Sequence, residues 1–377
     1  MFLNILKLIK KIYLWLPALV FLYFVYVPFV SNLFNSNTIL LDNKALAEKP
    51  KKFSARFAQE FTDYYNDTFA DRKKLVYKYV KLKQKLKIDT GQYFYGKDNW
   101  MFYDAAKVSN GNSIIGYLGE FRLGKSQLEH LKTLMERERD FYKKYGADYV
   151  LMVIPDKENV YAEYMPDYWQ KARVSDEAVS DDGLKFLREN SDVQTLRMKP
   201  LLLAAKKETS YPLYYKYDTH WNDIGGFIGF YNLMQSLKKY GVATDFIKPF
   251  TEYDITENGL SNSDMSPIEK DQRYALSYYP EISYRVVPTD RKYVIVYEND
   301  NPLIKGTIMI VGDSFAGAML PYLARTFERV VNVGYGSKEK GLYQKIMTEY
   351  KPQWVVHELI ERYFISLSSS DKYVNNM

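Results

Sequence analysis

The chain has 377 residues, of which 47% are hydrophobic and 26% are charged, and it contains no cysteine. This length suffices for one large domain or two ordinary ones. The absence of cysteine excludes a disulfide scaffold, a thiol nucleophile and a cysteine-based zinc site. The net charge of +6 is spread along the sequence, whereas nucleic-acid-binding proteins concentrate basic residues in one patch, so we expect no nucleic-acid partner.

An apolar segment near the N-terminus predicts a membrane helix. Residues 12–30 carry no charge, and at about 1.5 Å per residue a helix of this length crosses a hydrocarbon core. Basic residues precede the segment and no charge follows it up to residue 41, so the positive-inside rule places the N-terminus in the cytoplasm. The body of the protein is then expected outside the cytoplasmic membrane, in the periplasm or at the cell surface.

A cleaved signal peptide is the alternative interpretation of this segment. Such a peptide has an apolar region of about 7 to 15 residues that ends near small residues, but Ala45-Leu46-Ala47 lies far beyond residue 30. An uncleaved anchor fits the sequence better. We therefore expect a cytoplasmic tail (1–11), a transmembrane anchor (12–31), a stalk (32–50) and one extracytoplasmic domain (51–377).

The periodicity of the remaining chain predicts an α/β fold. Aromatic residues at helical spacing predict two helices within 51–88 with their aromatic stripe in a core, and two aromatic runs around a turn predict a hairpin over 93–103. We expect further helices at 126–145, 177–190, 200–207, 221–240, 316–327 and 338–350, and strands at 149–154, 293–297, 307–311, 329–333 and 354–356. Such alternation is typical of a layered fold with a largely parallel central sheet and flanking helices.

One polar region interrupts this alternation. Residues 251–288 contain strand-like fragments but show little periodicity. We expect this region to be an insertion or a lid.

A candidate nucleophile follows one of the predicted strands. The apolar run 308–311 leads into Gly312-Asp313-Ser314, and small residues then open a helix. A serine at this place lies at the carboxyl end of a strand and beside a helix N-terminus, where open α/β sheets bind ligands and backbone N–H groups can stabilise an oxyanion. The tripeptide alone is also a common turn sequence.

A serine nucleophile needs a general base, and the chain contains three histidines. His130 lies within a charged helix, where a solvated surface role explains it. His357 ends a buried strand near the C-terminus and is the second choice. His220 follows Asp218 by two residues, and in an extended segment these two side chains share a face, so that the carboxylate can orient the imidazole. The alternative is that Asp218 caps the following helix while His220 packs beneath Trp221.

A metal site is the other chemistry that these residues permit. Asp218 and His220 could combine with His357 or Asp313 as ligands, but no close ligand spacing such as His-x-x-x-His is present. We therefore expect no metal.

Two motifs together carry a resemblance to a known family. Asp218-Thr219-His220-Trp221-Asn222 and the later Gly312-Asp313-Ser314-Phe315 resemble the alginate O-acetyltransferase family of SGNH-hydrolase-like proteins, the AlgJ and AlgX type. In this family the Asp-x-His block precedes the serine, whereas in ordinary SGNH esterases the Gly-Asp-Ser block comes first. The segments 96–103, 154–161 and Glu361-Arg362 also look similar, as does the single N-terminal anchor.

The resemblance implies an SGNH-hydrolase-like fold and a role for each motif residue. Ser314 would be the nucleophile, His220 its general base and Asp218 the orienting carboxylate. The backbone N–H of Ser314 would bind the oxyanion, with Gly334 and Arg362 as weaker candidates for oxyanion or substrate contacts. No cofactor is implied.

The reaction implied is a two-step transfer of an acetyl group, through an acyl-serine, to hydroxyls of an exopolysaccharide. Because acetyl-CoA is cytoplasmic, a catalyst outside the membrane needs its acetyl groups delivered, and the resemblance suggests a membrane-bound O-acyltransferase (MBOAT) as the supplier. The sequence leaves two alternatives open: a carbohydrate acetylesterase with the same triad, and a non-catalytic polysaccharide-binding scaffold.

Overall fold

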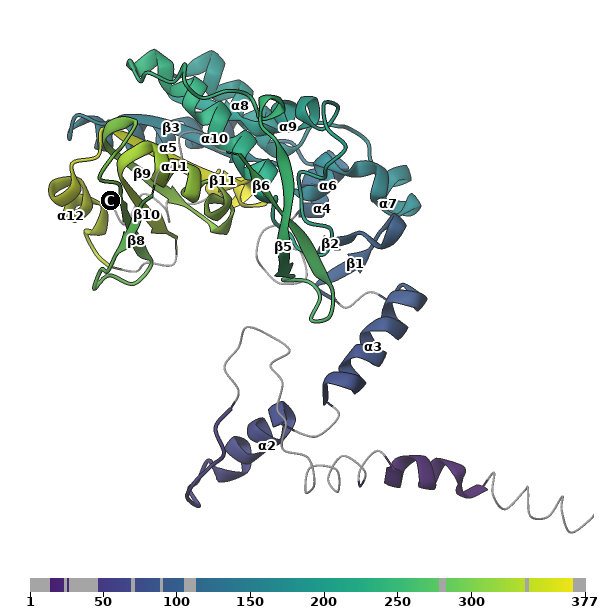
Figure 1. Cartoon of the computed structure of the whole chain (residues 1–377). Coiled ribbons are helices and arrows are strands. Elements are labelled where there is room, and N and C mark those ends of the chain that lie inside the picture. The colour runs from purple at the N-terminus through teal and green to yellow at the C-terminus, as the bar shows by residue number, and fades with distance from the viewer. Residues whose placement is uncertain are drawn as a thin grey trace, which may run out of the picture. The chain divides into compact units, whose positions relative to one another are not determined.

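The computed structural model describes residues 14–23, 26, 47–68, 72–88, 91–104, 113–277, 283–335 and 339–368. Its contacts divide the chain into two units, residues 1–86 and 87–377 (Figure 1). The division differs from the domain of 51–377 expected from the sequence, because the helices before residue 87 belong to the first unit.

The expected N-terminal segments lie largely outside the described residues. The tail 1–11 and most of the stalk 32–50 are not described, and of the anchor 12–31 only 14–23 and residue 26 are. Within the described ranges, no helix combines the length and the apolar character needed to span a membrane.

The first unit contains the two expected helices, α2 (Phe57–Thr68) and α3 (Arg72–Leu86). The expectation that their aromatic stripe forms a core is wrong, because α2 has no buried residue and Phe53 is 90% exposed. The rings stack on one another instead: the ring centroids of Phe53 and Phe57 are 4.2 Å apart, and those of Phe57 and Phe61 are 6.0 Å apart.

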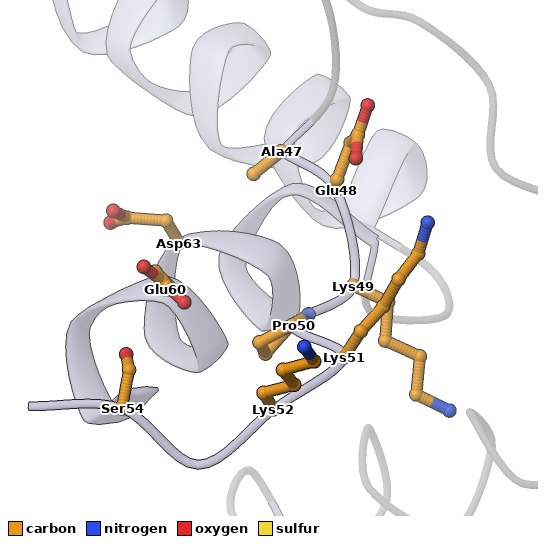
Figure 2. A pocket seen from close by; sticks show the side chains of 9 residues that line it. All are labelled: Ala47, Glu48, Lys49, Pro50, Lys51, Lys52, Ser54, Glu60 and Asp63. Carbon is orange, nitrogen blue, oxygen red and sulfur yellow. The ribbon is translucent and has the colours of Figure 1, made fainter. Parts of the chain in front are cut away.

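A pocket of about 550 Å³ lies beside α2 (Figure 2). The backbone N–H of Ala47 donates to Asp67 Oδ2 at 3.0 Å and holds the preceding segment against the helix. Lysine and carboxylate side chains are among the residues that line it, which are Ala47, Glu48, Lys49, Pro50, Lys51, Lys52, Ser54, Glu60 and Asp63. None of the expected catalytic residues lines it.

A seven-stranded sheet forms the centre of the second unit. Its first five strands run parallel, while β8 and β7 continue it antiparallel, so the sheet is largely parallel as expected. In spatial order the strands are β4 (Gln194–Arg197), β3 (Asp148–Ile154), β11 (Trp354–Ile360), β9 (Ile304–Gly312), β10 (Phe327–Gly334), β8 (Val294–Glu298) and β7 (Arg285–Val287).

Helices cover both faces of this sheet. Side chains alternate between the two faces along each strand, and both sets are apolar, so each face needs a covering layer. On β9, Ile308 and Ile310 pack into one core, whereas Met309 and Val311 pack into the other. The first core is completed by α9 (Met198–Ala205), α10 (Asp223–Leu237) and α11 (Leu320–Thr326). The second is completed by α5 (Lys125–Lys143), α8 (Val179–Asn190) and α12 (Leu342–Tyr350). The α/β layered fold is thus confirmed.

Short elements connect these layers. The expected hairpin is present, with β1 (Tyr93–Tyr95) antiparallel to β2 (Met101–Tyr103). The short helices are α4 (Ser113–Leu118), α6 (Lys157–Val160), α7 (Asp167–Ala172) and α13 (Phe364–Leu367), and the 3₁₀ turns are η1 (Lys97–Asn99), η3 (Ala162–Tyr164), η4 (Lys238–Tyr240), η5 (Phe250–Glu252), η6 (Ser314–Ala318) and η7 (Glu361–Tyr363).

Three local expectations differ from the structure. The edge strand β4 was not expected, because its half-buried Gln-Thr-Leu-Arg sequence lacks an apolar run. The helix expected at 316–327 is split into η6 and α11. The region 251–288 contains a separate antiparallel hairpin, β5 (Ile255–Asn262) with β6 (Lys270–Leu276), and its last part forms β7 of the main sheet.

Glycines on α10 let this helix approach the turn that carries Ser314. A methyl group added at Gly226 would lie 2.5 Å from Ala318 Cβ and 2.6 Å from the Ala318 carbonyl oxygen. One added at Gly229 would lie 2.5 Å from the Trp221 ring. The helix and the η6 turn therefore pack backbone against backbone, which only glycine allows at this distance.

We expect Gly226→Ala to destabilise the protein by about 1–3 kcal/mol, because the added methyl overpacks a contact with backbone atoms. Denaturant unfolding of the full chain measures the loss. Gly317→Ala is the matched control on η6, since a methyl there meets no described atom within 4 Å. Equal stability of the Gly226 variant and the wild type would contradict the close packing of α10 on η6.

Candidate active site

Ser314 lies where the sequence places it, after the end of β9 and at the start of a helical turn. The turn is η6, a 3₁₀ segment rather than an α-helix, and Asp313 caps it by accepting the Phe315 N–H at 2.9 Å. The Ser314 side chain is exposed. The tight capped turn thus presents a hydroxyl to solvent at the carboxyl edge of the sheet.

The two residues before the serine are fixed by the strand beneath them. A side chain at Gly312 would collide with the Glu358 carboxylate, and Glu358 Oε2 accepts the Asp313 N–H at 3.1 Å. Asp313 Oδ2 accepts the Ile360 N–H at 3.0 Å. Burial raises the pKa of Asp313 and, more strongly, that of Glu358. Asp313 therefore holds the turn to β11.

Asp218 and His220 meet in a tight bend rather than in the extended segment that we expected. Asp218 Oδ1 accepts the backbone N–H of His220 at 2.9 Å and contacts His220 Nδ1 at 2.7 Å. The alternative helix-cap role is wrong for Asp218, because Asn222 caps α10 by accepting the N–H groups of Ile224 and Gly225. The short polar side chain of Asp218 closes the bend on itself, which aims the carboxylate at the ring.

The bend brings the three expected side chains into one hydrogen-bonded line. His220 Nε2 lies 2.7 Å from Ser314 Oγ, although the two residues are 94 positions apart. A second bond ties the two segments together, because Trp221 Nε1 donates to the Phe315 carbonyl at 2.8 Å. The His220 and Phe315 rings also pack with centroids 4.6 Å apart. Carboxylate, imidazole and hydroxyl thus have the geometry of a serine-nucleophile triad.

The charges of this line favour a histidine that readily takes a proton. Burial raises the pKa of Asp218, but its hydrogen bonds from His220 outweigh burial and hold the pKa below its usual range. Burial likewise lowers the pKa of His220, and the hydrogen bond and charge of Asp218 outweigh it, so that the net shift is upward. His220 is therefore a stronger base than a free imidazole.

The other two histidines do not reach the serine. His130 lies on α5, as expected. His357 does not end its strand, because β11 continues to Ile360, and its ring is 1% exposed between Glu138 Oε2 at 2.8 Å and the Tyr149 hydroxyl at 3.3 Å. It is a core residue, so the second choice of base is wrong.

The two weaker candidates have structural partners. The Gly334 N–H donates to the Tyr293 carbonyl at 2.9 Å and is not available to an oxyanion. Arg362 is buried, pairs with Asp156, and places its guanidinium 5.5 Å from the centre of the Phe315 ring. Arg362 thus lies behind the serine turn. Ser314 is the first residue of η6, where a helical turn has no carbonyl of its own for its first N–H groups, so the Ser314 N–H stays the candidate for an oxyanion contact.

A lysine that the sequence did not single out holds the bend that contains Asp218 and His220. Lys157 Nζ donates to the carbonyls of Tyr215, Lys216 and Asp218, the last at 2.7 Å. Burial lowers the pKa of Lys157 to about 8. Lys157 belongs to the segment 154–161, which carries part of the family resemblance. That resemblance was the only indication in the sequence that Lys157 lies near the site.

A second missed residue, Asp264, comes from the turn of the β5–β6 hairpin. Its Oδ2 lies 3.7 Å from His220 Nδ1, and both of its oxygens accept hydrogen bonds from Thr219. Its polar surroundings in the sequence gave no signal of this contact. Asp218, His220 and Asp264 offer ligand atoms within 4.8 Å of one another, a set that suits zinc, although these atoms already bond one another or Thr219.

We expect the reactivity of Ser314 to depend on neutral His220. Because the pKa of His220 is raised, the rate at which a sulfonyl fluoride modifies Ser314 should fall as the pH drops through a value above the usual 6.5 or so. Asp218→Asn removes the charge that raises this pKa, so the midpoint should move to lower pH, with a rate about 10⁴-fold smaller. Intact-mass spectrometry against pH measures both. A midpoint that does not move in the variant would contradict the pairing.

Solved structures with similar folds are known. The chain is similar to PatB1 of Bacillus cereus (TM-score 0.52, 17% identity, 73% of this chain and 97% of that one). It is also similar to a DHHW family protein of Eubacterium siraeum (TM-score 0.50, 13% identity, 77% and 97%). The O-acetyltransferase domain of Pseudomonas putida AlgJ matches with a TM-score of 0.45 and 16% identity over 74% and 92% of the chains. No curated protein matches the sequence.

A family assignment comes from the sequence itself. The family described as "SGNH hydrolase-like domain, acetyltransferase AlgX" matches residues 94–359, which include all three residues of the hydrogen-bonded line and the whole seven-stranded sheet except the final residue of β11. The chain therefore belongs to the AlgX family of SGNH hydrolase-like acetyltransferases.

Proposed function

We propose that this protein is a membrane-anchored, extracytoplasmic O-acetyltransferase that acetylates hydroxyls of an exopolysaccharide through an acyl-serine intermediate. The observation that carries the proposal is the 2.7 Å contact of His220 Nε2 with Ser314 Oγ in a chain of an acetyltransferase family. A base hydrogen-bonded to an exposed serine is the arrangement that acyl transfer requires.

In the first step, Ser314 Oγ attacks the carbonyl carbon of a donor acetyl group while His220 Nε2 takes the hydroxyl proton. Asp218 stabilises the resulting imidazolium at Nδ1. The Ser314 N–H, open at the start of η6, stabilises the negative charge on the carbonyl oxygen. The bond to the donor group then breaks, His220 returns its proton to the leaving group, and the acetyl group remains on Ser314.

In the second step, a sugar hydroxyl attacks the acetyl-serine. His220 Nε2 removes the proton of the sugar hydroxyl, the new ester bond forms, and the bond to Ser314 breaks. Ser314 Oγ then takes the proton back from His220. His220 therefore removes a proton first from the Ser314 hydroxyl and then from the sugar hydroxyl. The free enzyme is regenerated without a cofactor.

The proposed location follows from the uncharged segment 12–30 and the basic residues before it. A catalyst outside the cytoplasmic membrane cannot draw on cytoplasmic acetyl-CoA directly. We propose an MBOAT protein as the partner that passes acetyl groups across the membrane to Ser314.

We expect Ser314→Ala to abolish acetylation of the polymer, because no other described hydroxyl contacts His220 Nε2. The acetyl content of the exopolysaccharide from cells that carry only this variant measures the effect. Ser210→Ala is the control, since Ser210 is also an exposed serine and takes no part in the hydrogen bonds that join Asp218, His220 and Ser314. Wild-type acetyl content with the Ser314 variant would contradict the catalytic role and favour a scaffold.

Transfer and hydrolysis differ only in which nucleophile meets the acetyl-serine. We expect the purified protein, given an activated acetyl ester, to form acetylated sugar when oligosaccharides of the host polymer are present, at the expense of free acetate. Mass spectrometry of the sugars and an assay of acetate measure this partition. Release of acetate alone with every oligosaccharide tested would identify the protein as an acetylesterase.

A further inference from the structure

The β5–β6 hairpin reaches the catalytic bend through its turn. Ser263 Oγ donates to the Tyr217 carbonyl, and Asp271 Oδ1 accepts the Tyr217 N–H at 2.9 Å. The Asp264 N–H donates to Asp218 Oδ2 at 2.9 Å. The oxygen of Asp218 that does not face His220 is therefore occupied by the hairpin, which leaves Oδ1 for the imidazole.

The carboxylate of Asp264 holds the residue between the two catalytic positions. Asp264 Oδ1 accepts the Thr219 N–H at 2.9 Å, and Oδ2 accepts the Thr219 hydroxyl at 2.6 Å. A hydroxyl has one proton, and Thr219 donates it in the hydrogen bond to Asp264 Oδ2. Only its lone pairs are left for other neighbours.

One of those neighbours is the catalytic imidazole. Thr219 Oγ1 lies 3.3 Å from His220 Nδ1, on the same ring nitrogen that contacts Asp218 Oδ1 at 2.7 Å. Both neighbours of Nδ1 are acceptors, so the neutral ring must carry its proton at Nδ1. His220 Nε2 is then unprotonated and can accept the proton of Ser314.

We propose that Asp264 is a positioning residue that acts through Thr219 to fix the catalytic tautomer of His220. The inference rests on the proposed function for its biological meaning, but the contacts that carry it are independent of the substrate. Asp264 also adds a second negative charge 3.7 Å from Nδ1, next to that of Asp218.

Asp264→Asn tests this role with almost no change of shape. The new amide group would donate to Thr219 Oγ1, and the hydroxyl proton would turn toward Nδ1. That arrangement favours the opposite tautomer, with its proton on Nε2, which cannot accept a proton from Ser314. Thr219→Val removes the hydroxyl while keeping the side-chain shape, whereas Thr219→Ser keeps the hydroxyl and removes only the methyl group.

The tautomer is measured by ¹⁵N NMR of the full chain with ¹⁵N-labelled histidine. The chain contains three histidines, so three sets of ring signals are expected. His220 is assigned by comparison with His220→Gln. The charged groups that face its ring are Asp218 on the bend, Asp264 on the hairpin, and Arg362 and Asp313 beneath the serine turn. The spectra give the tautomer and the pKa of His220 without any turnover.

We expect a single tautomer protonated at Nδ1 in the wild type and in Thr219→Ser. Asp264→Asn should show a mixture of the two tautomers and a lowered His220 pKa, because the second negative charge near Nδ1 is lost. Thr219→Val should keep the proton at Nδ1, because Asp218 Oδ1 still accepts it and no hydroxyl can donate to Nδ1. Asp264→Asn combined with Thr219→Val should therefore return to the single Nδ1 tautomer. The rate of Ser314 modification by a sulfonyl fluoride should fall about tenfold in Asp264→Asn alone. Glu257→Gln, an exposed acid on β5 of the same hairpin, should match the wild type.

The same His220 tautomer in wild type and Asp264→Asn would overturn the proposal, and so would a mixture that persists when Thr219→Val is added to Asp264→Asn. Loss of folding in Asp264→Asn shows in its unfolding curve, and Asp264→Ala, which also deprives the Thr219 hydroxyl of its acceptor, then decides. A failure of the proposed function can be told apart from a failure of this inference. A wild-type protein that transfers no acetyl group would contradict the proposed function, but the His220 spectra would still test the role of Asp264.

Discussion

The hydrogen bond between His220 and Ser314 joins two segments that meet only in the folded state. Such a bond transfers a proton well only if both side chains are held to within about half an ångström. The chain meets this requirement through backbone contacts. Trp221 bonds to the carbonyl of Phe315, and Gly226 lets α10 lie directly on η6. Helix α10, which follows His220, and the η6 turn, which carries Ser314, are therefore packed directly on each other.

Charges buried behind the site contribute to the same rigidity. Arg362 pairs with Asp156 beneath the Phe315 ring, and Glu361 accepts the Asp156 N–H at 2.6 Å. Burial raises the pKa of both Asp156 and Glu361 to about 7. Removing such groups from water is costly, and a buried ion pair of this kind stabilises little compared with apolar packing. These bonds tie η7 to the segment that follows β3, and Arg362 then packs on the ring of Phe315, the residue after Ser314.

The sequence predicts the parts of this protein that depend on local pattern. The parallel strands, the serine at the end of β9 and the Asp-x-His pair are visible because apolar runs and residue spacing determine them. Asp264 and Lys157 were missed, because their importance comes from hydrogen bonds to a bend that is distant in sequence. The conformation of that bend was misjudged for a related reason: a side-chain bond from Asp218 to the backbone outweighs any preference for an extended segment.

Within the Gly-Asp-Ser tripeptide, Gly312 and Asp313 have structural roles, whereas Ser314 is the residue that contacts His220. Gly312 makes room for Glu358, and Asp313 bonds to Phe315, Ile360 and Glu358. The Ser314 hydroxyl contacts only His220 among the described residues. A descendant that abandoned acyl transfer would therefore be free to replace the serine, while selection for folding would keep the glycine and the aspartate. A relative with the glycine and the aspartate but another residue in place of the serine is therefore expected to keep the fold of this turn and to lack acyl transfer.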